Sequence, residues 1–123
     1  MVIEEIISDL DEDELRTIYS FLTNFFLGLL EPVKPKDLVK YVKTNSVFDM
    51  RPYLKLIPEG LRMKLRGLVK NNKHLLEKYV NGEKLIELAG KKRKDLYEIL
   101  KTPKGTRWAN AFMRYIRQVV YLI

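Results

Sequence analysis

The chain of 123 residues contains no cysteine and a single histidine. Without cysteine it forms no disulfide, offers no thiolate to a metal ion and has no thiol nucleophile. This absence favours a reducing compartment, and we expect a cytoplasmic protein. Only one Gln accompanies the one His, beside abundant Lys, Glu, Ile and Tyr, and such thinning of labile side chains is typical of thermophile proteins.

Long apolar runs are also missing from the sequence. The run at residues 25–27 reaches residue 30 only when Gly28 is included, and the apolar run at residues 119–123 covers five residues, whereas a membrane-spanning helix needs about 20 residues. The N-terminal residues lack the basic and then apolar order of a signal peptide. With 46% hydrophobic and 32% charged residues, we expect a soluble globular protein of one domain, residues 1–123, with no membrane partner.

No catalytic motif is present. His74 is the only His, and its place among Lys73, Leu75 and Leu76 is typical of a partly exposed helical residue. No Gly-x-Ser-x-Gly sequence presents a serine nucleophile. We therefore expect no enzyme; an unrecognised activity would have to work with carboxylates, lysine or tyrosine alone, or with a metal bound near the N-terminus.

The one pattern with metal-ligand spacing is Asp9, Asp11 and Asp13, which matches positions 1, 3 and 5 of an EF-hand loop. Glu14 then stands where that loop requires glycine, and Ser20 stands where the bidentate glutamate belongs. Helix capping by Asp11 explains these acids better, and we expect no metal and no cofactor.

Apolar residues recur with helical spacing nearly throughout, and period-2 alternation is almost absent. The pattern predicts an all-α fold, a compact single-domain bundle of about six to eight mostly short helices. Gly90 is expected to end one of them, Asn81–Gly82 another, and Thr106 to cap the last. The predicted helices cover about residues 11–30, 36–43, 52–57, 58–71, 72–80, 83–89, 95–101 and 106–123.

Charge divides the chain into an acidic leader with an apolar helix, residues 1–31, and a basic helical body, residues 32–123. The first part has eight Asp and Glu against Arg16, a net charge of −7. The second has 22 Lys and Arg against eight Asp and Glu, a net charge of +14. A body this basic usually meets a polyanion, most often nucleic acid.

The acidic leader has three interpretations. It is a well-capped helix start, a segment that folds back on the basic body in place of a polyanion, or a docking segment for a basic partner protein.

The cations of the body form three clusters. One follows an edge of the 58–71 helix at i, i+4 and i+8, the second is a run after Gly90, and the third shares the arc of the last helix opposite Trp108 and Phe112. A solvated, lysine-rich surface explains any one cluster alone; three clusters with arginine favour phosphate contacts. The predicted nucleic-acid-binding residues are Arg62, Arg66, Lys70, Lys91, Lys92, Arg93, Lys94, Lys104, Arg107, Arg114 and Arg117.

The segment 102–107 places a hydroxyl and a glycine at a helix start, a generic anion site whose alternative is a plain capped turn. No stretch has the spacing of a homeodomain, zinc finger or basic zipper. We therefore expect contacts to the backbone of DNA or RNA with little sequence preference. In size, charge and helix content the chain is similar to small helical accessory subunits of nucleoprotein complexes, including those of CRISPR effectors and the helical domains attached to archaeal primases.

A second hypothesis is a protein-interaction or assembly subunit. Apolar side chains nearly encircle the predicted helix at residues 21–30, and the chain finishes on the apolar residues 119–123. An apolar end left in water favours association, so we expect it to lie in the core or under another subunit. A homo-oligomer or a partner protein would then bind at Phe21, Phe25, Phe26 and Leu30.

Overall fold

The computed structural model describes Ile18, Leu22, Thr23 and residues 34–123. Its elements are α3 (Pro35–Thr44), α4 (Arg51–Leu54), α5 (Glu59–Asn71), α6 (Lys73–Tyr79), α7 (Gly82–Lys92), α8 (Lys94–Leu100), α9 (Pro103–Val119) and the 3₁₀ turn η1 (Val120–Leu122). The described residues contain no strand, and the predicted all-α class is confirmed.

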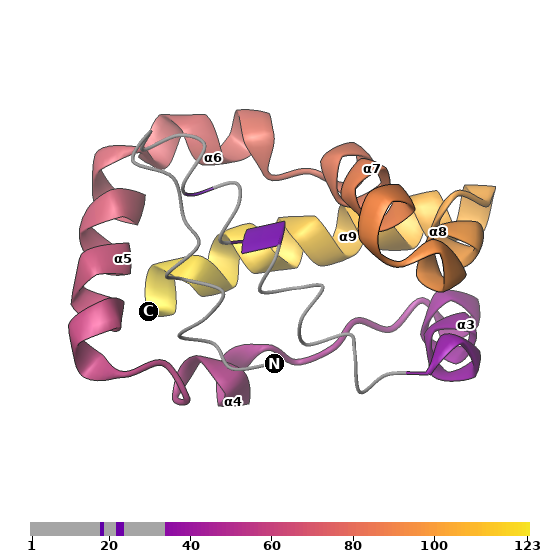
Figure 1. The fold of residues 1–123 in the computed structure, drawn as a ribbon, viewed down its shortest axis with the longest axis horizontal. Coiled ribbons are helices and arrows are strands. Elements are labelled where there is room, and N and C mark those ends of the chain that lie inside the picture. Colours follow the sequence, from indigo (N-terminus) through magenta and orange to yellow (C-terminus); the bar gives the residue numbers. More distant parts are fainter. Residues whose placement is uncertain (1–17, 19–21, 24–33) are drawn as a thin grey trace.

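Helix α9 is the central element of the fold (Figure 1). Helices α7 and α8 pack against it and against each other, and α3 packs on both α8 and α9. Helix α5 lies at the other end of α9, where it contacts η1 and α6. The two ends of α9 therefore have different neighbours.

The amphipathic sequence of α9 explains its central place. Its inner face carries Trp108, Phe112, Met113, Ile116 and Val119, all buried, as helical spacing predicts. The end of the chain is buried only in part: Val120 and Ile123 belong to the core, whereas Tyr121 and Leu122 are exposed. In the N-terminal part, Ile18, Leu22 and Thr23 are helical and buried.

One helix boundary is confirmed and one differs from the prediction. Helix α6 ends at Tyr79, just before Asn81 and Gly82, and Asn81 Nδ2 donates to the Lys78 carbonyl at 3.2 Å. The Asn81 side chain also accepts a hydrogen bond from the Lys84 N–H at 3.0 Å and caps the start of α7. Gly90 does not end α7, which continues to Lys92. Gly90 instead lies against the Tyr97 ring, which a Cβ would approach to 3.3 Å, so the glycine serves the packing of α7 on α8.

The start of the last helix is also corrected. Thr102, not Thr106, is its cap, and the Thr102 Oγ1 accepts a hydrogen bond from the Gly105 N–H at 3.0 Å. Pro103 and Lys104 therefore form the first turn, where proline fits because its missing N–H would be unsatisfied in any case. The Thr106 hydroxyl donates to the Leu100 carbonyl at 3.1 Å and ties α9 to the end of α8.

The loop before α4 is fastened to α9 by a polar cluster. The Asp49 carboxylate accepts hydrogen bonds from Arg51 Nε and Nη2 and from the Tyr115 hydroxyl, each at 2.8 Å. The Met50 N–H donates to the same hydroxyl at 3.2 Å. Hydrogen bonds from Arg51 and then Tyr115 hold the pKa of Asp49 well below its usual value.

Within the part of the chain that the structure describes, no helix combines the length and the apolar character that crossing a bilayer requires.

Replacing Gly105 tests the close approach of α9 to α8. A Cβ there would lie 2.8 Å from Leu100 Cα and 2.9 Å from the Ile99 carbonyl carbon, so we expect Gly105→Ala to lower the free energy of unfolding by about 1–3 kcal/mol. Thermal denaturation would record a Tm roughly 4–12 °C lower. The matched control is Gly67→Ala in α5, where the added methyl meets nothing within 4 Å; it should raise stability by about 0.5–1 kcal/mol. Equal effects of the two substitutions would contradict this packing.

The Asp49 cluster predicts a pH dependence of stability. Because the folded-state pKa of Asp49 is lowered, its contribution is present above the unfolded-state pKa of about 3.9 and is lost as the pH falls through the folded-state value. The Tm difference between the wild type and Asp49→Asn should therefore be largest near pH 6 and shrink towards about pH 2. Glu87→Gln, an exposed carboxylate in α7, is the control. A difference for Asp49→Asn that is independent of pH would contradict the assignment.

Candidate nucleic-acid interface

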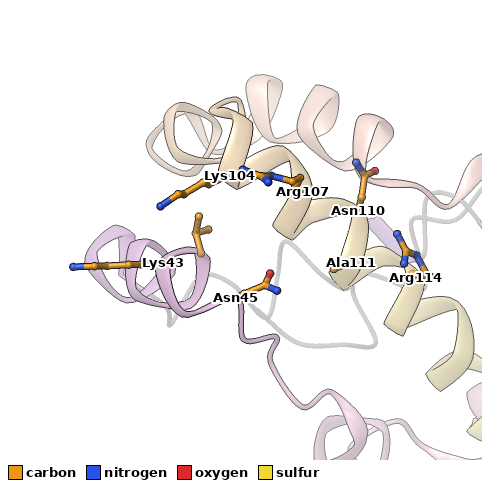
Figure 2. A pocket seen from close by; sticks show the side chains of 8 residues that line it. Lys43, Asn45, Lys104, Arg107, Asn110, Ala111 and Arg114 are labelled. Atoms are coloured by element: carbon orange, nitrogen blue, oxygen red, sulfur yellow. The ribbon is translucent and has the colours of Figure 1, made fainter.

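A groove of about 470 Å³ lies between the end of α3 and the outer face of α9 (Figure 2). Cationic and amide side chains line both of its walls, with two small apolar residues between them. Its lining residues are Val42, Lys43, Asn45, Lys104, Arg107, Asn110, Ala111 and Arg114. We call this feature the α3–α9 groove.

Four cations belong to the groove: Lys43 from α3, and Lys104, Arg107 and Arg114 from α9. All four are exposed. None of them forms an ion pair or a side-chain hydrogen bond with any residue that the structure describes, and no Asp or Glu is among the described residues that line the groove. The described walls of the groove therefore concentrate positive charge without a carboxylate.

The α3 wall owes its position to the end of that helix. Asn45 follows α3 in the left-handed conformation, with φ of 54°, and the Ser46 N–H donates back to the Tyr41 carbonyl at 3.0 Å. Asparagine adopts this conformation more readily than other non-glycine residues. The reversal turns the chain towards α9 and places the Asn45 side chain in the groove (Figure 2).

Aromatic packing then holds this turn against α9. Phe48 packs edge-on against Tyr41 with ring centroids 4.3 Å apart, and against Trp108 and Phe112 at 5.8 and 5.7 Å. The Trp108 indole N–H donates to the Ser46 carbonyl. Because these contacts are buried and directional, they fix how close Lys43 lies to the α9 wall.

The α9 wall begins at the Thr102 cap. The Gly105 N–H is used by Thr102 Oγ1, and the same hydroxyl donates to the Ile99 carbonyl at 2.8 Å. The segment 102–107 is thus a capped turn in its backbone, whereas the side chains of Lys104 and Arg107 serve the groove. The first turn of α9 has no acidic residue, so these two cations face the positive end of the helix dipole uncompensated.

The cluster on α5 lies at the opposite end of α9. Arg62 is half-buried and pairs with Glu59 at 3.9 Å, whereas Arg66 and Lys70 are exposed. Arg66 and Lys70 line a second, smaller hollow of about 220 Å³ between α5 and η1. Its lining residues are Arg66, Val69, Lys70, Lys73, Val120, Tyr121 and Ile123. We call this hollow the Tyr121 pocket.

The run of four cations is not the loop that the sequence predicts. Lys91 and Lys92 form the last turn of α7, where cations suit the negative end of the helix dipole. Arg93 pairs with Asp95 through Nε and Nη2, each at 3.2 Å, and this contact lowers the pKa of Asp95. Lys94 opens α8. None of the four lines the groove or the pocket.

The structure divides most of the predicted cations between the α3–α9 groove, the Tyr121 pocket and the junction of α7 with α8. The structure brings Lys104, Arg107 and Arg114 together in the α3–α9 groove, and Arg66 and Lys70 in the Tyr121 pocket. Arg117 is half-buried and lines neither. Sequence reasoning missed Lys43 and Lys73; each stands beside a helix end rather than in a cluster, so no spacing signal marked it.

Some predictions fall on residues that the structure does not describe. The proposed partner-binding residues Phe21, Phe25, Phe26 and Leu30 lie outside the described ranges, as do the acids of the leader with Asp9, Asp11 and Asp13. Within the described ranges, no three His, Asp or Glu side chains lie close enough together to hold a metal ion.

Comparisons of the chain with protein-family models, with curated protein sequences and with solved structures give no match.

The Asn45 turn predicts a specific order of stabilities. Asn45→Ala keeps the Cβ in the left-handed region but removes the polar side chain that makes asparagine tolerant of it, and we expect a loss of about 1 kcal/mol. Asn45→Gly removes the same side chain without that strain and should stay within about 0.5 kcal/mol of the wild type. Urea denaturation midpoints of the three proteins measure the order; an alanine variant as stable as the glycine variant would contradict the φ of 54°.

Proposed function

We propose that this protein is a non-enzymatic nucleic-acid-binding protein that holds the phosphate backbone in the α3–α9 groove. The observation that carries the proposal is the set of four exposed cations on two walls of one groove, with no carboxylate among the lining residues. A role as an accessory subunit of a nucleoprotein complex is consistent with the small size and the net charge of +7.

Folding gains nothing from this arrangement of charge. Like charges held close together repel each other, and Lys104 and Arg107 also oppose the dipole of α9. An external polyanion removes both penalties and releases its condensed counterions on binding. The free energy that the cations cost the isolated protein therefore becomes part of the driving force for association.

The chemistry of the lining favours backbone contacts over reading of bases. The guanidinium groups of Arg107 and Arg114 match the geometry of phosphate oxygens. No aromatic ring on which a base could stack is among the described lining residues, and the amides of Asn45 and Asn110 suit sugar and phosphate oxygens as well as bases. We therefore expect affinity that varies little with sequence.

The same lining suits binding better than catalysis. The described residues that line the groove include no His, Asp, Glu, Ser or Thr, the side chains that most often act as a general base or an activated nucleophile. Lys43 and Lys104 are exposed, so their surroundings do not supply the burial that activates a lysine.

A salt titration of paired variants tests the proposal. Arg107→Gln with Arg114→Gln removes two groove cations, and Lys55→Gln with Lys64→Gln removes two exposed cations that line neither hollow. On duplex DNA the groove variant should flatten the slope of log K against log salt by about 1.8, because each lost phosphate contact removes about 0.9. Near 0.1 M salt its affinity should fall by about 10- to 100-fold.

The control variant has the same net charge as the groove variant, so it should stay within about threefold of the wild type and keep the wild-type slope. Fluorescence anisotropy with a labelled oligonucleotide measures both quantities. Equal losses in the two variants would show that net charge alone attracts the probe, and an affinity that does not change with salt would exclude phosphate contacts altogether.

A further inference from the structure

The Tyr121 pocket lies on the same face of α9 as the groove. Arg114, Gln118 and Tyr121 follow one another at i, i+4 and i+7, and all three are exposed. Arg107 lies about two helical turns before Arg114 and therefore belongs to the same row. The groove and the pocket therefore lie at the two ends of one exposed strip that runs along α9 and η1.

The pocket combines an open aromatic ring with three cations. Tyr121 is 48% exposed, and Lys73 Nζ lies 5.8 Å from the centroid of its ring. Arg66 and Lys70 of α5 also line the pocket. A planar ring flanked by cations is the arrangement on which proteins stack a base of a single strand while neutralising its phosphate.

Arg66 is held in place for such a contact. Its Nε donates to the main-chain oxygen of Ile123 at 2.9 Å, which holds the guanidinium at the wall of the pocket. The two Nη groups have no hydrogen-bond partner among the described residues. They remain available to a phosphate, and the exposed Lys73 can exchange its weak contact with the ring for the same phosphate.

We propose that the ligand of this strip is single-stranded nucleic acid, with its phosphates in the α3–α9 groove and one base stacked on Tyr121. The inference rests on the proposed function and adds the strand state and the stacking residue to it. A base in a duplex is paired and stacked, so it reaches a protein ring only after unpairing. An unpaired base stacks on Tyr121 without that cost.

The length of the strip sets a minimum length for the ligand. Lys104 and Tyr121 are seventeen positions apart, or about 26 Å along a helix that rises 1.5 Å per residue. A stacked strand that rises about 3.4 Å per nucleotide places about eight phosphates over this length. A strand of about four nucleotides can occupy the groove or the pocket, but not both.

The experiment measures anisotropy with four labelled probes: oligothymidylate of about twelve nucleotides, the same of about four, an abasic strand of equal charge, and a duplex. Tyr121→Ala should weaken binding of the long oligothymidylate by about 5- to 100-fold, as loss of one base stack does, and should leave the abasic strand within about twofold. Tyr121→Phe keeps the ring and should stay near the wild type. A fifth probe, oligouridylate of about twelve nucleotides, compares the affinity for RNA with the affinity for DNA.

The outcomes separate the two proposals. If Tyr121→Ala leaves the long oligothymidylate unaffected, or weakens the abasic strand equally, base stacking is wrong. If the duplex binds as tightly as the single strand at equal charge, or the short strand as tightly as the long one, the single-strand assignment is wrong. In each case the proposed function stands as long as Arg107→Gln with Arg114→Gln still weakens every probe. If that variant weakens none, the proposed function itself fails. Because Tyr121 is exposed, its variants should keep the wild-type Tm, which is measured alongside.

Discussion

The position of α3 against α9 depends on how Phe48 is packed. Its ring is the only contact partner that Tyr41, Trp108 and Phe112 share among the described aromatic pairs, and it comes from a loop rather than a helix. Burying this ring pulls the loop, and with it the end of α3, onto α9. Together with the hydrogen bond from Trp108 to the Ser46 carbonyl and the packing of α3 on α8 and α9, this contact sets the distance of Lys43 and Asn45 from Arg107 and gives the groove its second wall.

Helix α9 serves stability and surface chemistry with separate faces. Its inner residues are among the most deeply buried side chains of the described chain, with Trp108 and Phe112 fully inaccessible, so the apolar face alone is sufficient to anchor the helix. The outer face is then free of any packing requirement. Cations there cost the isolated protein some stability, which screening by water and salt reduces, so a central core helix can also present a phosphate-binding row.

Prediction from the sequence succeeded where the signal was local and failed where it was tertiary. The apolar row of α9 and the helix after Pro58 follow from 3.6-residue spacing, and the structure agrees. Gly90 misled because a glycine that makes room for the Tyr97 ring has the same sequence signature as one that ends a helix. Only the α9 wall of the groove could be predicted, because Lys104 and Arg107 are one helical turn apart in the sequence. Lys43 lies near them because Phe48 packs against α9, and no periodic sequence pattern marks that tertiary contact.

Ion pairs in the described chain also form between residues that are close in the sequence. Arg51, Arg93 and Lys101 each have a carboxylate two or three residues away, and each is paired with it. From Ile99 to the last residue the sequence has no Asp or Glu, so no cation of α9 can find a carboxylate within its own helix. Any neutralising group must come from another element or from outside the protein. Among the described residues, the walls of the groove in α3 and α9 supply none. An external strand of phosphates meets the requirement with a spacing that a row of arginines one or two turns apart can follow.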